Sequence, residues 1–152
     1  MPLAVPAVFT VAHIRLRGQE ADIAVYRGPG NSLCLQLPTS DTVPCDLAPR
    51  PGRAIRLAYA NWVYLDATGY GFGMLLVGTV SPAVAPVRIS LGNDKWIKAR
   101  VVSLPEELNI AFRLFYIERR ISFESLNQSL PVVALDNQGR EIGRTSYRIE
   151  GG

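Results

Sequence analysis

Short segments in which apolar and polar residues alternate dominate this sequence, and they restrict the chain to β-structure. In residues 8–17, Ile14 and Leu16 alternate with Arg15 and Arg17, so a strand here has one apolar and one charged face. Clusters of glycine, proline, asparagine and aspartate separate such segments. The 13 glycines and 11 prolines of the 152-residue chain therefore mark turns between strands, and the 48% of hydrophobic residues excludes a disordered chain.

The number and spacing of these segments predict the fold class. We expect roughly ten short strands, with hairpins around residues 92–94 and 136–139 and a single helical turn at 104–109. Residues 117–130 are the only longer stretch with helical spacing, and their β-branched and aromatic content argues against a helix. The sequence predicts one all-β domain over residues 1–152, a sandwich or barrel. Residues 46–73 read as an elaborated loop or insertion.

Charge and composition exclude several classes of protein. The net charge is +3, and the basic residues are scattered and alternate with apolar ones, which favours solvated strand faces over a nucleic-acid surface. No apolar run approaches the roughly 20 residues of a membrane helix. One histidine and two cysteines are too few for most zinc sites, and no calcium or phosphate-loop pattern occurs. We expect no cofactor and no metal.

The single histidine also argues against an enzyme. A Ser-His-Asp or Cys-His arrangement would have to use His13, for which Glu20 and Asp22 on the following strand are the nearest acids in the sequence. There is no G-x-S-x-G elbow, and no pair of carboxylates stands out. We expect His13 to be a structural or surface residue and the protein to be non-catalytic.

Aromatic residues gather in one stretch of the chain. Five of them fall within fifteen residues, beside three alternating glycines: Tyr59, Trp62, Tyr64, Tyr70 and Phe72. One interpretation is a tight bulged turn whose aromatic rings pack on the edge of the sandwich. The other is a platform that binds carbohydrate or another small ligand through exposed rings.

The two cysteines bear on the compartment. Ten residues rich in turn formers separate Cys34 from Cys45, so the chain can return and a disulfide is sterically reasonable. A reduced buried pair is the alternative. A disulfide would indicate an oxidising compartment, although residues 1–6 lack the basic start and uninterrupted apolar core of a secretory signal. On that interpretation a signal or anchor has been removed, or export takes another route.

Several motifs resemble a known group of domains. Residues 24–30 read AVYRGPG and lead to Cys34 and Cys45; GTVSPAVAPVRI follows at 78–89, RVVSLP at 100–105 and VVALDNQGREIGR at 132–144. This pattern resembles the extracytoplasmic β-sandwich domains of actinobacterial-type membrane-anchored or secreted proteins of unassigned function. The resemblance covers most of residues 22–144. It implies an immunoglobulin-like antiparallel sandwich, a Cys34–Cys45 disulfide and an extracytoplasmic setting, and it carries over no catalytic residue.

Together these features predict a structural or protein-interaction module. The terminal segments 3–11 and 146–149 are strand-like, and an exposed strand can pair with a neighbouring chain. We therefore expect the partner to be a second copy of the chain or another surface protein, with carbohydrate binding as the alternative. We expect neither nucleic-acid binding nor insertion into a membrane.

Overall fold

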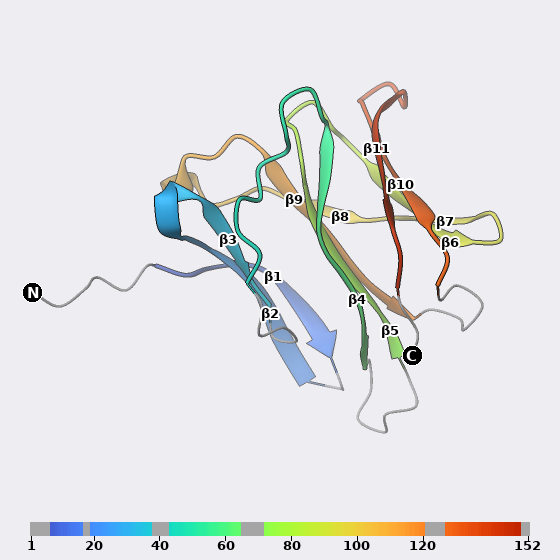
Figure 1. Ribbon diagram of the computed structural model, residues 1–152, viewed down its shortest axis with the longest axis horizontal. Coiled ribbons are helices and arrows are strands. Elements are labelled where there is room, and N and C mark those ends of the chain that lie inside the picture. The colour runs from blue at the N-terminus through green and yellow to red at the C-terminus, as the bar shows by residue number, and fades with distance from the viewer. Residues whose placement is uncertain (1–6, 17–18, 38–42, 65–71, 121–126, 150–152) are drawn as a thin grey trace, which may run out of the picture.

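The computed structural model describes residues 7–16, 19–37, 43–64, 72–120 and 127–149 (Figure 1). In this part of the chain there are eleven strands, all paired antiparallel, and two 3-10 helices, η1 (Pro29–Asn31) and η2 (Glu106–Leu108), but no α-helix. The strands are β1 (Phe9–Leu16), β2 (Gln19–Arg27), β3 (Leu33–Gln36), β4 (Ile55–Tyr64), β5 (Phe72–Val80), β6 (Val87–Gly92), β7 (Lys95–Lys98), β8 (Arg100–Val102), β9 (Arg113–Arg120), β10 (Leu130–Leu135) and β11 (Glu141–Tyr147). None of the helices seen here has the length and apolar character needed to span a bilayer.

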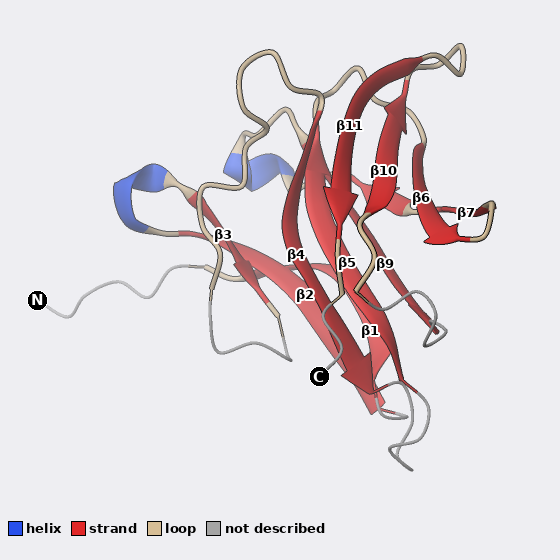
Figure 2. Ribbon diagram, turned by 45° about the vertical axis from the view of Figure 1, so that its right-hand side comes forward, coloured by secondary structure: helices blue, strands red, loops and turns tan. Residues whose placement is uncertain are grey.

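The strands form three sheets that stack in layers (Figures 1 and 2). The central sheet has the order β4-β5-β9-β8, one outer sheet has the order β11-β10-β6-β7, and the other outer sheet is β1-β2-β3. The all-β sandwich predicted from the sequence is confirmed: the central sheet faces β11-β10-β6-β7 across one apolar core. The β1-β2-β3 sheet adds a further layer, because a second core lies on the other face of the central sheet.

Strands β5 and β9 form the middle of this stack, and residues 74–77 and 114–117 in them are buried on both faces. Leu75 and Val77 of β5 belong to the core shared with β1-β2-β3, whereas Met74 and Leu76 belong to the core of the sandwich. In β9, residues 114–117 alternate between the two cores in the same way. A strand covered on both sides has no solvated face to fill with polar residues, which explains the continuous apolar stretches in these two segments.

Element boundaries differ from the sequence prediction in three places. The sequence predicts two strands at 54–57 and 62–65, but Ile55–Tyr64 form one strand, β4, with a bulge between Leu57 and Tyr59; residue 65 lies outside the described residues. The sequence also predicts a single strand over 95–102, but these residues form two strands in different sheets, because the chain crosses from β7 to β8 at the buried Ala99. Strand β9 continues to Arg120, and residues 121–126, the middle of the segment with helical spacing, lie outside the described residues.

Both predicted hairpins are present. The β6–β7 turn has Asn93 and Asp94 at φ of 52° and 59°, the left-handed conformation that a tight two-residue hairpin turn requires. In the β10–β11 turn, Asp136 Oδ1 accepts hydrogen bonds from the backbone N–H of Gln138 at 2.8 Å and of Arg140 at 2.9 Å. The bond from the Arg140 N–H is the main reason that the pKa of Asp136 is lowered. The predicted helical turn at 104–109 is the 3-10 helix η2.

Gly78 lets a large ring pack against the middle of β5. A Cβ at this position would lie 2.4 Å from the backbone oxygen of Arg56 and 2.4 Å from two ring carbons of Phe115. Phe115 is fully buried and fills the core of the sandwich. Only a residue without a side chain allows β4, β5 and the Phe115 ring to approach this closely.

We expect Gly78→Ala to lower the free energy of unfolding by about 1–3 kcal/mol, the usual cost of overpacking a core. Urea denaturation followed by circular dichroism measures it. In a Phe115→Leu background, which removes part of the ring, the same substitution should cost less. An equal loss in both backgrounds would contradict the assigned contact.

The side chain of Tyr147 links β11 to β6 across the intervening strand β10. Its hydroxyl donates a hydrogen bond to the backbone oxygen of Ser90, and the residue is 3% exposed. Burial raises the pKa of Tyr147 to about 12, from 10.0. The fold therefore favours the protonated phenol.

This shift predicts a loss of stability at high pH. Below pH 10 the phenol is protonated in both the folded and the unfolded chain, so its contribution is fully present. Between pH 10 and 12 the unfolded chain ionises first, and about 2–3 kcal/mol is lost. Urea unfolding from pH 9 to 12 should show this slope, and Tyr147→Phe should flatten it. A wild-type slope identical to that of Tyr147→Phe would contradict the assignment.

Candidate functional site

The connection from β3 to β4 is tied down by the disulfide that the resemblance implied. Cys34 and Cys45 are bonded, with their Cα atoms 3.9 Å apart, and the N–H of Leu35 donates to the backbone oxygen of Pro44 at 2.8 Å. Cys34 is fully buried and Cys45 is exposed. The bridge lies beside the β1-β2-β3 sheet and does not join the two sheets of the sandwich. It therefore fixes the start of the segment that leads to β4.

Gly28 leaves room for this disulfide. A Cβ at residue 28 would lie 2.3 Å from Cys34 Sγ and 3.6 Å from Cys45 Sγ. The backbone N–H of Gly28 also donates to the oxygen of Ser32 at 2.8 Å. The first glycine of the AVYRGPG motif, Gly28, is thus explained by its contact with the sulfur atoms.

Replacing both cysteines by alanine should lower the free energy of unfolding by about 2–3 kcal/mol, because the cross-link restricts the unfolded chain. Thermal and urea denaturation measure this loss. Native mass spectrometry after alkylation without reductant should find no free thiol in the wild-type protein. Two alkylated cysteines, or no loss of stability in the double variant, would contradict a structural bridge.

Beyond the disulfide, residues 46–49 are held by contacts with the central sheet. Leu47 is 2% exposed and belongs to the core shared with β1-β2-β3, and its backbone oxygen accepts a hydrogen bond from the buried Thr79 hydroxyl. The next backbone oxygen, that of Ala48, accepts a hydrogen bond from Arg56 Nη1 at 3.1 Å. These bonds fix the course of the segment before it turns into β4.

A tight turn then fixes the positions of two arginines, Arg50 and Arg53. Arg50, Pro51, Gly52 and Arg53 carry proline and glycine in the order typical of a type II turn. The Arg53 N–H donates to the Arg50 oxygen at 2.9 Å, and Gly52 has φ of 77°. Because proline fixes one dihedral and glycine supplies the other, the turn is rigid and presents the side chains of Arg50 and Arg53 from its two ends.

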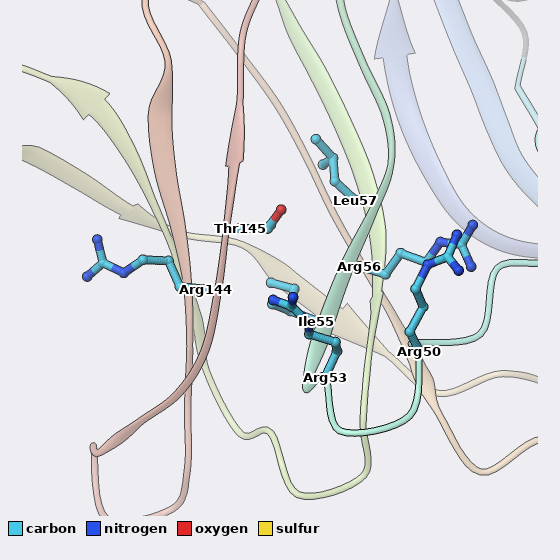
Figure 3. Close-up of a pocket in the computed structure, with 7 residues that line it drawn as sticks. All are labelled: Arg50, Arg53, Ile55, Arg56, Leu57, Arg144 and Thr145. Atoms are coloured by element: carbon cyan, nitrogen blue, oxygen red, sulfur yellow. The ribbon is translucent and has the colours of Figure 1, made fainter.

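These arginines line an open groove of about 270 Å³ at the seam between β4 and β11. In Figure 3, Arg50 and Arg56 extend towards the same end of the groove, Arg53 extends towards β11, and the Thr145 hydroxyl points towards β4. The Arg144 guanidinium points away on the far side of β11 (Figure 3). The residues that line this arginine groove are Arg50, Arg53, Ile55, Arg56, Leu57, Arg144 and Thr145.

The charges of the arginine groove are only partly balanced. The nearest carboxylate to Arg56 is Asp46, at 3.9 Å and 79% exposed. Arg144 is occupied by Glu141, at 2.8 Å, and this hydrogen bond lowers the pKa of Glu141. Arg50 and Arg53 have no carboxylate partner within the residues that the structure describes. The groove therefore has a surplus of positive charge.

A second basic surface crosses the outer face of the β11-β10-β6-β7 sheet. The strand registers place Arg144 beside Val133, Val133 beside Arg88, and Arg88 beside Lys98. Trp96, 44% exposed, lies next to this row and lines a hollow of about 200 Å³ with Arg88 and Lys98. The exposure of Arg88, Lys98 and Arg144 agrees with the solvated strand faces expected from the alternating sequence.

The predicted aromatic platform is described only in part. Tyr59 packs against the core shared with β1-β2-β3. The β4–β5 register brings Trp62 opposite Met74 and Tyr64 opposite Phe72. The side chains of Trp62, Tyr64 and Phe72, and all of Tyr70, lie outside the described residues. Carbohydrate binding at this platform stays a prediction.

His13 lies on the exposed face of β1 and pairs with Asp22 across the β1–β2 register. Its Nδ1 atom is 2.6 Å from Asp22 Oδ1, and the two side chains are 76% and 51% exposed. In the described part of the chain, no group of three or more histidine, cysteine, aspartate or glutamate residues could hold a metal ion.

Comparison of the chain with protein families, with curated proteins and with solved structures finds no match.

The sequence interpretation did not single out the arginine groove. Arg50, Arg53 and Arg56 stand three residues apart in a segment read as a loop, and the available signal was the Pro-Gly turn between two arginines. Thr145 lies some ninety residues later in the chain, so only the packing of β4 against β11 brings it to the same place.

Proposed function

We propose that this protein is a non-catalytic, extracytoplasmic interaction module that self-associates through the free edge of β1. The observation that carries this proposal is that β1 is an edge strand of eight residues whose only pairing partner in the described chain is β2. Its second row of backbone N–H and C=O groups is available to another strand. The other features below support the type of domain and its compartment.

The strand order favours an immunoglobulin-like sandwich over residues 55–147. With β4 to β11 taken in chain order as strands A, B, C, C′, D, E, F and G, the two sheets read A-B-E-D and G-F-C-C′. Immunoglobulin-type sandwiches use this order. In this interpretation the β1-β2-β3 sheet is an addition packed on the A-B-E-D face.

The disulfide supports an oxidising compartment. Disulfides persist in secreted and surface proteins and are rare where glutathione keeps thiols reduced. The Cys34–Cys45 bridge is built into the fold through the buried Cys34 and the close approach of Gly28, so it is a structural bond. A structural disulfide therefore supports the proposed extracytoplasmic location of the module.

The other sheet edges are less suited to pairing. Strand β7 has four residues with a lysine at each end, and β8 has three residues; short, charged edges resist pairing. The edge of β3 meets Cys45 and Pro44, while β4 and β11 contact each other across the seam. Strand β1 contains no lysine or proline, and Val8 just before it is 52% exposed.

A second copy of this chain is the partner that fits. Two β1 edges related by a two-fold axis would pair antiparallel and extend the β1-β2-β3 sheets of both copies into one six-stranded sheet. A bulge between Thr10 and Ala12 interrupts the strand, so the regular pairing would use Ala12–Leu16. Such an interface closes on itself and gives a dimer rather than a fibre.

Size-exclusion chromatography with light scattering tests the proposal. We expect a concentration-dependent dimer for the wild-type chain and a monomer for His13→Lys. His13 is exposed, and two-fold pairing of two Ala12–Leu16 segments sets residue 13 opposite Arg15 of the second copy, where a lysine adds like-charge repulsion and disfavours edge pairing. Ser146→Lys, which adds charge to the exposed side of β11, is the matched control and should leave the dimer intact.

A strict monomer at millimolar concentration would overturn the proposal. Loss of the dimer with Ser146→Lys but not with His13→Lys would assign association to β11 instead. Thermal denaturation of each variant confirms that it is folded before its mass is interpreted.

A further inference from the structure

We propose that the arginine groove binds a phosphate group, carried by a phosphate monoester about the size of a phosphorylated sugar. The groove lies at the β4–β11 seam, on different strands from the β1 edge. Binding here therefore does not depend on self-association, and either proposal can fail without the other.

The first argument is charge. Arg50, Arg53 and Arg56 all line one groove. Among the described residues, the one carboxylate that forms an ion pair with any of them is Asp46, which is 3.9 Å from Arg56 and mostly exposed. Arg50 and Arg56 extend towards the same end of the groove (Figure 3), and an anion bound there balances their positive charge. A phosphate dianion compensates more of this charge than a carboxylate, and the planar fork of arginine matches its oxygen atoms.

The second argument is that the groove is formed in advance. The Pro51–Gly52 turn fixes the positions from which Arg50 and Arg53 extend. Arg56 is 26% exposed and is held by its hydrogen bond to Ala48, while the buried Leu47 and the disulfide anchor the same segment. Because little of the chain has to be ordered on binding, little of the favourable free energy of the anion interaction is lost to ordering the protein.

The third argument is size and lining. A volume of about 270 Å³ holds a phosphate together with a small organic group, and it is just below the range of pockets for drug-sized ligands. Ile55 and Leu57 give the groove an apolar wall, and Thr145 brings a hydroxyl from β11. In this arrangement Arg50 and Arg56 bind the phosphate oxygens, and Arg53 and Thr145 lie where the hydroxyl groups of a sugar could meet them (Figure 3).

Isothermal titration calorimetry at constant ionic strength tests this proposal, with glucose 6-phosphate, inorganic phosphate and glucose as probes and sodium chloride to balance the salt. We expect saturable binding of both phosphates at one site per chain and none of glucose. Tighter binding of glucose 6-phosphate than of inorganic phosphate supports a monoester site, as proposed. Equal affinity overturns the monoester assignment and leaves a phosphate-ion site. Absence of saturable binding of either phosphate overturns the site altogether.

Variants locate the site. Arg50→Gln and Arg53→Gln should each weaken the binding of glucose 6-phosphate about tenfold or more, since each removes a charged hydrogen-bond donor. Arg119→Gln is the matched control: Arg119 is an exposed arginine of β9, opposite Met74 and far along the central sheet from the groove. If Arg119→Gln weakens the binding of glucose 6-phosphate as much as Arg50→Gln does, the loss of affinity reflects the net charge of the protein, and the arginine groove is not the binding site.

Arg56→Gln is less informative alone, because it also removes the hydrogen bond to Ala48. Thr145→Val serves in its place, since it removes only the hydroxyl from the groove. It should weaken glucose 6-phosphate severalfold and leave inorganic phosphate unchanged. An unchanged affinity for both ligands would remove Thr145 from the site.

Discussion

Burial of the central sheet on both faces is the constraint on which the rest of this structure depends. Strands β5 and β9 supply alternate residues to two cores, so neither outer sheet can be removed without exposing an apolar face of the strands in the middle. The same double packing requires Gly78, where β4 and the Phe115 ring leave no space for a side chain. It also shapes the surface, because the two basic surfaces and the free β1 edge lie on an outer sheet, at a sheet edge or in a connection.

Much of the fold could be predicted from local patterns. Alternation located most strands, and the Asn-Asp and Asp-Asn-Gln-Gly turns located both hairpins because their side chains and φ preferences act within a few residues. The layering could not be predicted in the same way. The continuous apolar residues 74–77 are compatible with any buried strand, and only the pairing of β5 with β9, some forty residues later, shows that both faces are covered. The crossing at Ala99 was missed for a similar reason, since residues 95–102 contain no glycine, proline, asparagine or aspartate that would mark a break.

The candidate sites also differ in how much of each could be predicted from local sequence and how much depends on long-range packing. The disulfide was expected from the resemblance, and the turn-rich spacing of the cysteines made it sterically reasonable while leaving a reduced pair as the alternative. Its reason in the fold became clear only with Gly28 against the sulfur. The arginine groove depends on a turn that the sequence shows and on the contact of β4 with β11 that it does not show. The aromatic residues at 59–72 drew attention through their density alone. Of these, Tyr59 is partly buried and packs against a core, so a high density of aromatic residues in the sequence does not distinguish packed rings from exposed ones.

The order of the layers along the chain has a consequence for synthesis. The β1-β2-β3 sheet is complete once residue 36 has been made, yet the residues that cover its apolar face, among them Leu75, Val77 and Leu114, come much later. During synthesis or export this sheet has nothing to pack against until the middle of the chain arrives. Until then Ile23, Val25 and Leu35 are exposed and can associate with the apolar surface of a neighbouring chain.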